Sequence, residues 1–254
     1  MLLAIDVGNT LTDFGFFLDG ELRERFSIKT ESNRSQDEIQ ASFSLLLKDK
    51  GIEVSCIEGA IISSVVPPLT PIYQGIVLDL FGVEAKVLGP KLKTGIRVDV
   101  EEPKEVGADL IADCAGALKK YGPSCIIADL GTATKVLLLT DKGAFAGCTI
   151  GAGMAISLDA MVSKTAVLPE ISLQIPNKIV GRNTVDCMNS ALTYGTAFGI
   201  KGLCDAIEKE VGYPLKRILT GGYAKYVAPL LGEFDYAPNL CLEGLAAIHS
   251  KNGK

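Results

Sequence analysis

The chain has 254 residues, of which 48% are hydrophobic and 22% charged, and its formal net charge is -5. This length can bury the core of one large domain or of two smaller ones. The acidic balance argues against a general nucleic-acid binder, which would carry a basic face. It leaves open an anionic ligand, because backbone N–H groups can hold phosphate without net positive charge.

The first half of the chain predicts strands followed by helices mixed with strands. Three strands come first, and Asp19-Gly20 is the expected hairpin turn between the second and the third. A helix, a buried strand, a proline-started helix that ends at Gly82, another strand and a long helix follow. The predicted ranges are 2–6, 12–18, 21–28, 36–50, 59–63, 65–82, 84–88 and 103–121.

The second half restarts the same series. Its predicted strands are 125–129, 135–139, 144–150 and 217–219, and its predicted helices are 155–163, 183–211, 224–231 and 240–250. Asp6 lies 123 residues before its counterpart Asp129, a spacing too long for a solenoid repeat. We therefore predict an α/β protein with duplicated lobes over residues 1–121 and 122–254.

Each half contains an acidic, glycine-bearing turn between two apolar runs. The copies read AIDVGNTLTDFGFFLDGEL from Ala4 and IIADLGTATKVLLLTDKGAF from Ile126. Backbone N–H groups and hydroxyls in such a turn can hold phosphate, whereas the aspartate can hold the cation that bridges phosphate and protein. Two turns facing each other across a cleft would hold a triphosphate and its metal. One copy alone could simply close a hairpin.

Other features restrict the class of protein further. No apolar run approaches the roughly 20 residues of a membrane helix, and the start lacks the basic segment of a signal peptide. Seven scattered cysteines without a C-x-x-C pair predict reduced, buried thiols in a cytoplasmic protein. The single histidine, His249, argues against a histidine-ligated metal or a histidine-based triad.

The paired turns resemble those of the actin, sugar-kinase and Hsp70 superfamily, in which ATP lies between two ribonuclease-H-like lobes. Further motifs narrow the resemblance to the type III pantothenate kinase family. They occur in the order DVGNT at 6–10, ISSVVPPLTP at 62–71, KTG at 93–95, EVGAD at 105–109, DLGTAT at 129–134, SKTAVLP at 163–169, GRNT at 181–184, TGG at 220–222 and LEGL at 242–245. The resemblance implies phosphorylation of pantothenate by ATP, the first step of coenzyme A biosynthesis. It also implies Mg²⁺, a monovalent cation (K⁺ or NH₄⁺) and a homodimer.

The resemblance assigns a role to individual residues. Asp109 is the implied general base, Asp6 is oriented toward Mg²⁺, and Asp129 is the implied ligand of the monovalent cation. The implied ATP contacts are Asp6, Gly8, Asn9, Thr10, Thr12, Gly131, Thr132, Thr134, Gly221 and Gly222. The implied substrate contacts are Val100, Gly107, Leu110, Thr165 and Thr184.

The chain departs from the family pattern at several of these positions. Leu110 replaces an arginine expected to meet the pantothenate carboxylate, and Val100 replaces a tyrosine. Asp13 stands where an apolar residue is common, and Lys135 where a threonine is common. Three hypotheses follow: a working pantothenate kinase with a rearranged site, a kinase with another substrate, or a non-catalytic, nucleotide-binding regulator.

The expected homodimer has a second motivation in the sequence. The helices predicted at 155–163 and 183–211 carry apolar residues on more than one side, which indicates a second partner surface. Burial within their own lobe is the alternative. The residues concerned are Leu158, Met161, Val162, Met188, Leu192, Tyr194, Phe198 and Ile200.

Overall fold

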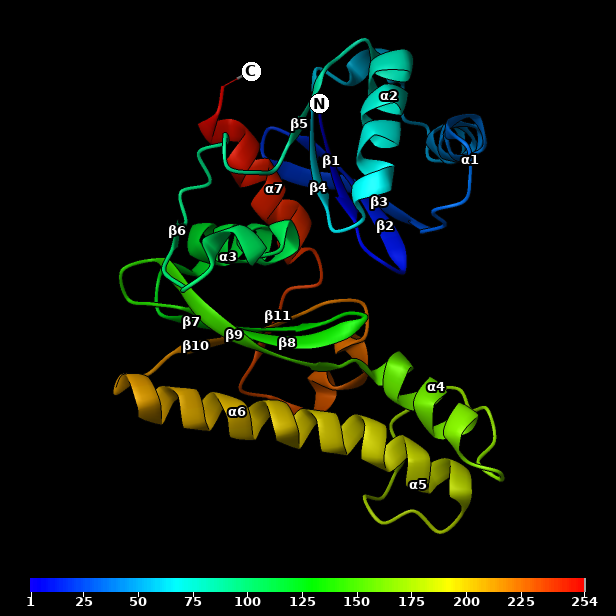
Figure 1. Cartoon of the computed structure of the whole chain (residues 1–254), viewed down its shortest axis with the longest axis vertical. Helices are drawn as coiled ribbons and strands as arrows, with labels where there is room; N and C mark the ends of the chain where they lie inside the picture. The colour runs from blue at the N-terminus through cyan, green and yellow to red at the C-terminus, as the bar shows by residue number, and fades with distance from the viewer. Residues whose placement is uncertain (254) are drawn as a thin grey trace. The chain divides into compact units, whose positions relative to one another are not determined.

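The computed structural model describes residues 1–253, which form two compact units (Figure 1). The first unit contains Met1–Ile96, Glu102–Lys120 and the segment from Leu240 onward, and the second contains Arg97–Glu101 and Tyr121–Asn239. This division differs from the predicted one, because the final helix belongs to the first unit and a short stretch before residue 102 belongs to the second.

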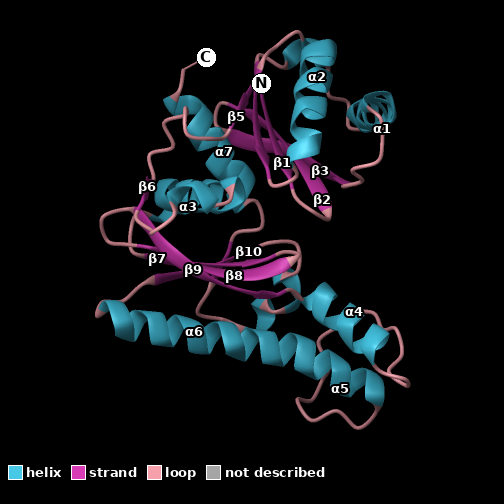
Figure 2. Cartoon of the chain, viewed as in Figure 1, coloured by secondary structure: helices cyan, strands magenta, loops and turns pink. Residues whose placement is uncertain are grey.

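The first unit is built on a mixed sheet with the strand order β3-β2-β1-β4-β5 (Figure 2). β1 pairs antiparallel with β2 and parallel with β4. The predicted turn is confirmed, since Asp19 and Gly20 both have positive φ angles, 53° and 84°. The strands are β1 (Leu2–Val7), β2 (Leu11–Leu18), β3 (Glu21–Lys29), β4 (Gly59–Ser64) and β5 (Ala85–Val87).

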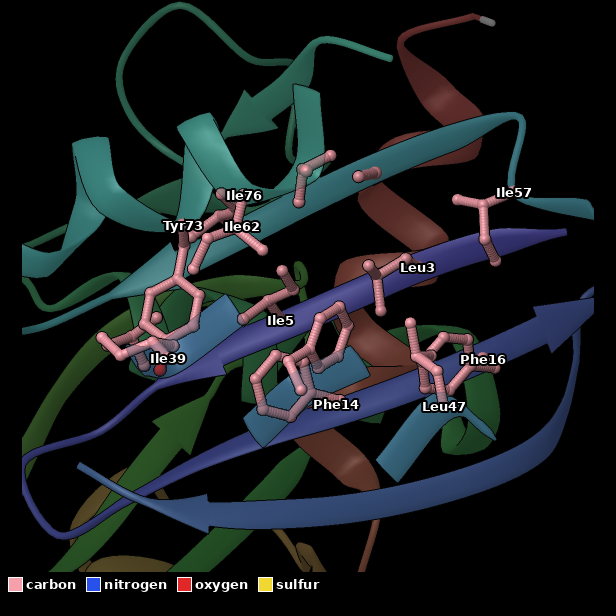
Figure 3. Close-up of a cluster of buried hydrophobic side chains, with 14 of the residues drawn as sticks. Leu3, Ile5, Phe14, Phe16, Ile39, Leu47, Ile57, Ile62, Tyr73 and Ile76 are labelled. Atoms are coloured by element: carbon pink, nitrogen blue, oxygen red, sulfur yellow. The ribbon is translucent and has the colours of Figure 1, made fainter. Parts of the chain in front are cut away.

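Alternation along β1 separates an apolar face from a face that carries Asp6. Leu3 and Ile5 point into a core closed by α1 (Gln36–Asp49) and α2 (Thr70–Phe81), as Figure 3 shows. Because successive side chains alternate in a strand, Ala4 and Asp6 point to the other face. There α7 (Leu240–Lys251) packs against β1 and β4. The pattern that buries the core therefore directs Asp6 toward α7.

The helix predicted at 103–121 divides into two parts. A 3₁₀ turn, Pro103–Glu105, comes first, and α3 (Ala108–Tyr121) begins after Gly107. α3 packs tightly on α7, and glycines on both helices permit the close approach. A Cβ atom on Gly244 would collide with the carbonyl of Ala112, and a Cβ atom on Gly116 would collide with the carbonyl of Leu240. This close approach fixes the first turn of α3 relative to the sheet.

The second unit repeats the sheet of the first. Its order is β11-β10-β7-β8-β9-β6, so β9-β8-β7-β10-β11 corresponds to β3-β2-β1-β4-β5. The pairing directions match as well, with β7 antiparallel to β8 and parallel to β10. The strands are β6 (Arg97–Val98), β7 (Cys125–Leu130), β8 (Ala133–Leu139), β9 (Ala144–Ala152), β10 (Lys216–Thr220) and β11 (Asp235–Tyr236). The duplication predicted from the sequence is present.

The helices of the second unit differ from the prediction in two places. α4 (Met154–Lys164) is as expected, but the range 183–211 contains α5 (Thr184–Ser190), a π-helical segment (Ala191–Gly195) and α6 (Thr196–Val211). The helix predicted at 224–231 is wrong. Two 3₁₀ turns stand there, Ala224–Tyr226 and Ala228–Leu230. Pro229 lacks the N–H group that a continuous helix needs.

None of the seven cysteines forms a disulfide, as predicted, but their burial is mixed. Cys56, Cys148 and Cys187 are exposed, which contradicts the expectation that every thiol is buried. Within residues 1–253, no helix has the length and apolar character needed to cross a membrane.

Candidate functional site

The first glycine-bearing turn connects β1 and β2. The Gly8 N–H donates to the Leu11 carbonyl at 3.0 Å, and a Cβ atom at Gly8 would lie 2.9 Å from that oxygen. The turn therefore requires glycine. Asn9 and Thr10 are exposed at its tip, where they can meet a ligand. This is the geometry expected of a phosphate-binding hairpin.

Thr12, predicted to contact ATP, lies inside the core. Its side chain is fully buried, and its hydroxyl accepts a hydrogen bond from the Tyr73 hydroxyl at 3.2 Å. A second hydroxyl, that of Thr30, lies 3.0 Å away. These contacts give Thr12 a structural role beneath the turn, because a direct contact with nucleotide would require an exposed hydroxyl.

Asp6 lies in an acidic environment on the β1 face that α7 covers. Burial and the nearby charge of Asp109 raise the pKa of Asp6 to about 7, and Asp13 adds a smaller effect in the same direction. The neighbouring Ser63 and Cys241 side chains oppose the rise in this pKa. An incoming cation would relieve the repulsion among these carboxylates.

Asp109, the predicted general base, stands in the first turn of α3. Its Oδ1 accepts a hydrogen bond from the Leu110 N–H at 3.0 Å and lies against Gly107. Because Gly107 has no side chain, it leaves room for the Asp109 carboxylate. A Cβ atom at residue 107 would occupy that space. Two predicted site residues separated by about a hundred positions, Asp6 and Asp109, are close enough to interact electrostatically.

The oxygen donors around Asp6 fit Mg²⁺. Magnesium usually takes one or two protein carboxylates and completes its shell with water and substrate phosphates. Within residues 1–253, no group of three or more His, Cys, Asp or Glu side chains is arranged to hold a metal by itself. Asp6 would therefore hold Mg²⁺ together with phosphate oxygens.

Sequence reasoning missed Cys241, which lies beside Asp6, and Asp113, whose charge acts on Cys241. Cys241 comes from α7, and burial beside Asp6 and Asp113 raises the pKa of its thiol well above the ordinary value. Asp113 is 2% exposed on α3, one helical turn after Asp109. The spacing of the two α3 aspartates was the only available signal, because nothing local predicts that α7 returns to β1.

The second turn connects β7 and β8 within the second unit. The Gly131 N–H donates to the Ala133 carbonyl at 3.1 Å, and the Gly153 N–H donates to the Thr132 carbonyl at 3.1 Å. A Cβ atom at Gly153 would lie 2.5 Å from the Gly131 carbonyl, so this glycine also supports the turn. Thr132 and Thr134 are half-buried and accessible to a ligand in part.

The Gly221-Gly222 turn, predicted to meet adenosine, packs beside the second hairpin. Gly221 has a φ of 93°, and the next N–H but one, that of Tyr223, donates to the Leu130 carbonyl at 2.9 Å. A Cβ atom at Gly221 would lie 2.5 Å from Asp129 Oδ1. The residue must be glycine both for its backbone conformation and for this close approach.

Asp129, the implied ligand of a monovalent cation, already contacts a cation of the chain itself. Lys135 Nζ lies 2.6 Å from Asp129 Oδ2, and the side chains are only 15% and 13% exposed. An additional K⁺ or NH₄⁺ at this oxygen would meet the ammonium group. The residues at this position therefore do not fit the monovalent cation that the family implies.

The predicted substrate contacts are dispersed over different elements. Leu110 is a core residue with 6% exposure, and Gly107 precedes it at the start of α3. Val100 is half-buried in the stretch before residue 102. Thr165 and Thr184 are exposed, the first at the end of α4 and the second at the start of α5. Leu110 can thus offer only an apolar surface to a ligand.

Comparison with known families agrees with the repeated hairpins and their aspartates. The family model described as type III pantothenate kinase matches residues 2–206. The chain belongs to the type III pantothenate kinase family. The resemblance predicted from the ordered motifs is confirmed, and membership in a kinase family implies ATP as the phosphate donor.

Solved structures show the fold over the whole chain. A Campylobacter jejuni structure named for the Baf family of transcriptional activators has 18% identity and a TM-score of 0.61, with 98% of each chain covered. Component A of (R)-2-hydroxyglutaryl-CoA dehydratase from Acidaminococcus fermentans has 15% identity and a TM-score of 0.56, covering 97% of this chain and 95% of that one. The activator of 2-hydroxyisocaproyl-CoA dehydratase from Clostridium difficile, with bound ADPNP, has 12% identity and a TM-score of 0.53, with 97% and 92% covered. The predicted actin-like ATPase fold is confirmed.

Proposed function

We propose that this member of the family transfers the γ-phosphoryl group of ATP to the primary hydroxyl of pantothenate. Family membership supports the reaction class. The observation that carries the proposal is the proximity of Asp109 to Asp6, because it brings a carboxylate base beside the carboxylate that would hold Mg²⁺. Phosphoryl transfer depends mainly on positioning and charge stabilisation, so these groups suffice for the chemistry.

Each named residue has a role in the proposed step. Asp109 accepts the proton of the pantothenate hydroxyl as its oxygen forms a bond to the γ-phosphorus. The bond from that phosphorus to the bridging oxygen breaks, which yields ADP and 4′-phosphopantothenate. Asn9 and Thr10, exposed at the tip of the first hairpin, offer polar groups to the phosphates. Bound Mg²⁺ supplies neutralisation of the phosphate charge.

A homodimer is part of the proposal. Met188, Leu192 and Ile200, cited above for a partner surface, are buried within the second unit instead. Phe198 is 52% exposed, however, and the same unit carries a set of other exposed apolar side chains. They are Ile150, Ile156, Val167, Ile179, Val180, Val185 and Leu203. A second copy that covers them would explain this exposure. The free thiols suit a reducing compartment, so we assign the dimer to the cytoplasm.

A second candidate function follows from the burial of Leu110. An arginine at this position would offer a charge-assisted fork to a carboxylate, whereas the core leucine offers none. A protein that binds ATP but does not bind pantothenate would act as a nucleotide-dependent regulator. It would still bind nucleotide through its hairpins but would not phosphorylate pantothenate.

A coupled kinase assay separates the two functions. The natural chain is supplied with ATP and Mg²⁺, and ADP release is compared for pantothenate, for pantothenol, which lacks the carboxylate, and for no acceptor. Pantothenate-dependent ADP release with formation of the phosphorylated product supports the kinase. Calorimetric binding of ATP without acceptor-dependent turnover would support the regulator instead.

A further inference from the structure

We propose that the ammonium group of Lys135 is a built-in monovalent cation at Asp129, so that this chain binds nucleotide without K⁺ or NH₄⁺. The inference goes beyond the proposed reaction and rests on it only in assuming that the nucleotide is ATP. It follows from the disagreement between the cation that the family implies and the ion pair found at this position.

The register of the hairpin aligns the two side chains. Asp129 on β7 is paired directly with Lys135 on β8. Directly opposed residues of an antiparallel pair project from the same face of the sheet, with Cβ atoms about 5 Å apart. The ion pair is therefore fixed by two neighbouring backbones, and the lysine needs no rearrangement of the chain to reach the carboxylate.

Both oxygens of the Asp129 carboxylate have close neighbours. Oδ2 of Asp129 contacts Lys135 Nζ at 2.6 Å. Oδ1 lies against the backbone of Gly221, where a Cβ atom would come within 2.5 Å. A dissolved cation would have to share Oδ2 with an ammonium of the same charge, and like charges at such a distance repel strongly in a partly buried site.

The tethered group can perform the electrostatic task of a dissolved ion. K⁺, NH₄⁺ and the lysine side chain each carry one positive charge, and the lysine ammonium neutralises Asp129 directly through its contact with Oδ2. Because the group is covalently attached, its presence does not depend on the salt composition of the solution.

Thermal unfolding tests the proposal without requiring turnover. We compare the natural chain, Lys135→Thr and Lys142→Thr in KCl, NH₄Cl and NaCl at equal ionic strength. Lys142 is an exposed turn lysine of the same unit and controls for the loss of a positive charge. For the natural chain, and likewise for Lys142→Thr, the unfolding midpoint should be the same in all three salts.

Lys135→Thr should respond differently. In NaCl its midpoint should fall by roughly 5–10 °C, because Asp129 is left half-buried without its ammonium partner. KCl or NH₄Cl should restore much of this loss. In the double variant Asp129→Asn/Lys135→Thr, the selective response to K⁺ should vanish, which would place the ion at Asp129.

Two results would overturn the proposal. One is a natural chain that K⁺ stabilises selectively over Na⁺, and the other is a Lys135→Thr variant that unfolds like the natural chain and ignores K⁺. If Lys135→Thr fails to fold, calorimetry on the natural chain and on Lys135→Arg decides: ATP should bind equally well in KCl and NaCl. A several-fold gain in affinity with K⁺ would reject the inference. Failure of pantothenate turnover would leave all of these measurements unaffected.

Discussion

The first hairpins of the two units have the same strand pairing but differ in the charges beside their leading aspartates. In the first, Asp6 is paired across the strands with Asp13, which Arg25 contacts at 2.8 Å. In the second, the corresponding Asp129 is paired with Lys135. One leading aspartate is thus repelled by its neighbours, whereas the other is already neutralised. The two copies of the hairpin therefore differ in electrostatics. The first, with Asp6, is suited to an incoming cation, whereas in the second the charge of Asp129 is neutralised by Lys135.

The largest expected effect tests whether the acidic group beside the first hairpin, Asp6 with Asp109, performs the chemistry. Asp109→Asn should lower kcat by about 10²–10⁴-fold, because it removes the base and keeps the shape, while ATP affinity stays unchanged. Steady-state kinetics and calorimetry would measure both. Asp37→Asn is the matched control, since Asp37 is an exposed acidic residue in the first turn of α1. Undiminished turnover by Asp109→Asn would remove this aspartate from the mechanism.

A second variant should show that the other hairpin depends on its ion pair for stability. Asp129→Asn leaves Lys135 without its carboxylate in a largely buried position, and it should cost about 3 kcal/mol of unfolding free energy. Urea unfolding would measure the loss. Asp235→Asn breaks an exposed pair with Lys216 and should cost less than about 1 kcal/mol. Equal costs for the two variants would contradict the contrast between buried and exposed pairs.

The corresponding change in the first hairpin should have the opposite sign above neutral pH. In the metal-free protein the pKa of Asp6 is raised from 3.8 to about 7, so between these two pH values the folded state retains a proton that the unfolded state has released. Stability contributed by this proton is present below the unfolded pKa and is lost as pH rises through the folded one. Asp6→Asn avoids the loss.

This variant should therefore be more stable than the natural chain by about 1–2 kcal/mol at roughly pH 8, with the difference shrinking toward about pH 4. Urea unfolding in the presence of a chelator would measure it at both values. A variant less stable than the natural chain at the higher pH would show that Asp6 is stabilised there by groups other than those identified above.

The smallest effect concerns two equivalent threonines. Thr12 and Thr134 each precede the residue that faces the leading aspartate, but Thr12 is fully buried and Thr134 only partly. Thr12→Val should cost about 1 kcal/mol, because the hydroxyls of Tyr73 and Thr30 lose a partner, and it should leave ATP affinity unchanged. Thr134→Val should weaken ATP binding with little loss of stability. Calorimetry would measure ATP affinity, and urea unfolding would measure stability. If Thr12→Val weakened ATP binding and Thr134→Val lowered stability, the two roles assigned here would be wrong.

Local patterns predicted most of the secondary structure and the duplication. The two Asp-Gly-Thr turns, the Asp19-Gly20 hairpin and the stop at Gly82 depend on neighbouring residues, and all are present. The 3₁₀ turns near Pro229 were mistaken for a helix, although the proline itself was a signal against it.

The surroundings of the site could be predicted only in part. The motifs indicated Asp6 and Asp109, but the contribution of Cys241 depends on packing between segments far apart in the sequence. The burial of Thr12 depends likewise on Tyr73, sixty-one residues away. Lys135 was recognised as a departure from the family pattern, whereas its contact with Asp129 required the strand register.

The return of α7 to the first unit has a consequence for how the chain matures. During synthesis, β1 to β5 and α3 leave the ribosome before Tyr121–Asn239 of the second unit, and α7 emerges only after that segment. Until then, the strand face that carries Ala4 and Asp6 lacks its cover, and Gly116 has no helix to pack on. The packing of the first unit can therefore be completed only after residues Tyr121–Asn239 of the second unit and the following α7 have been synthesised.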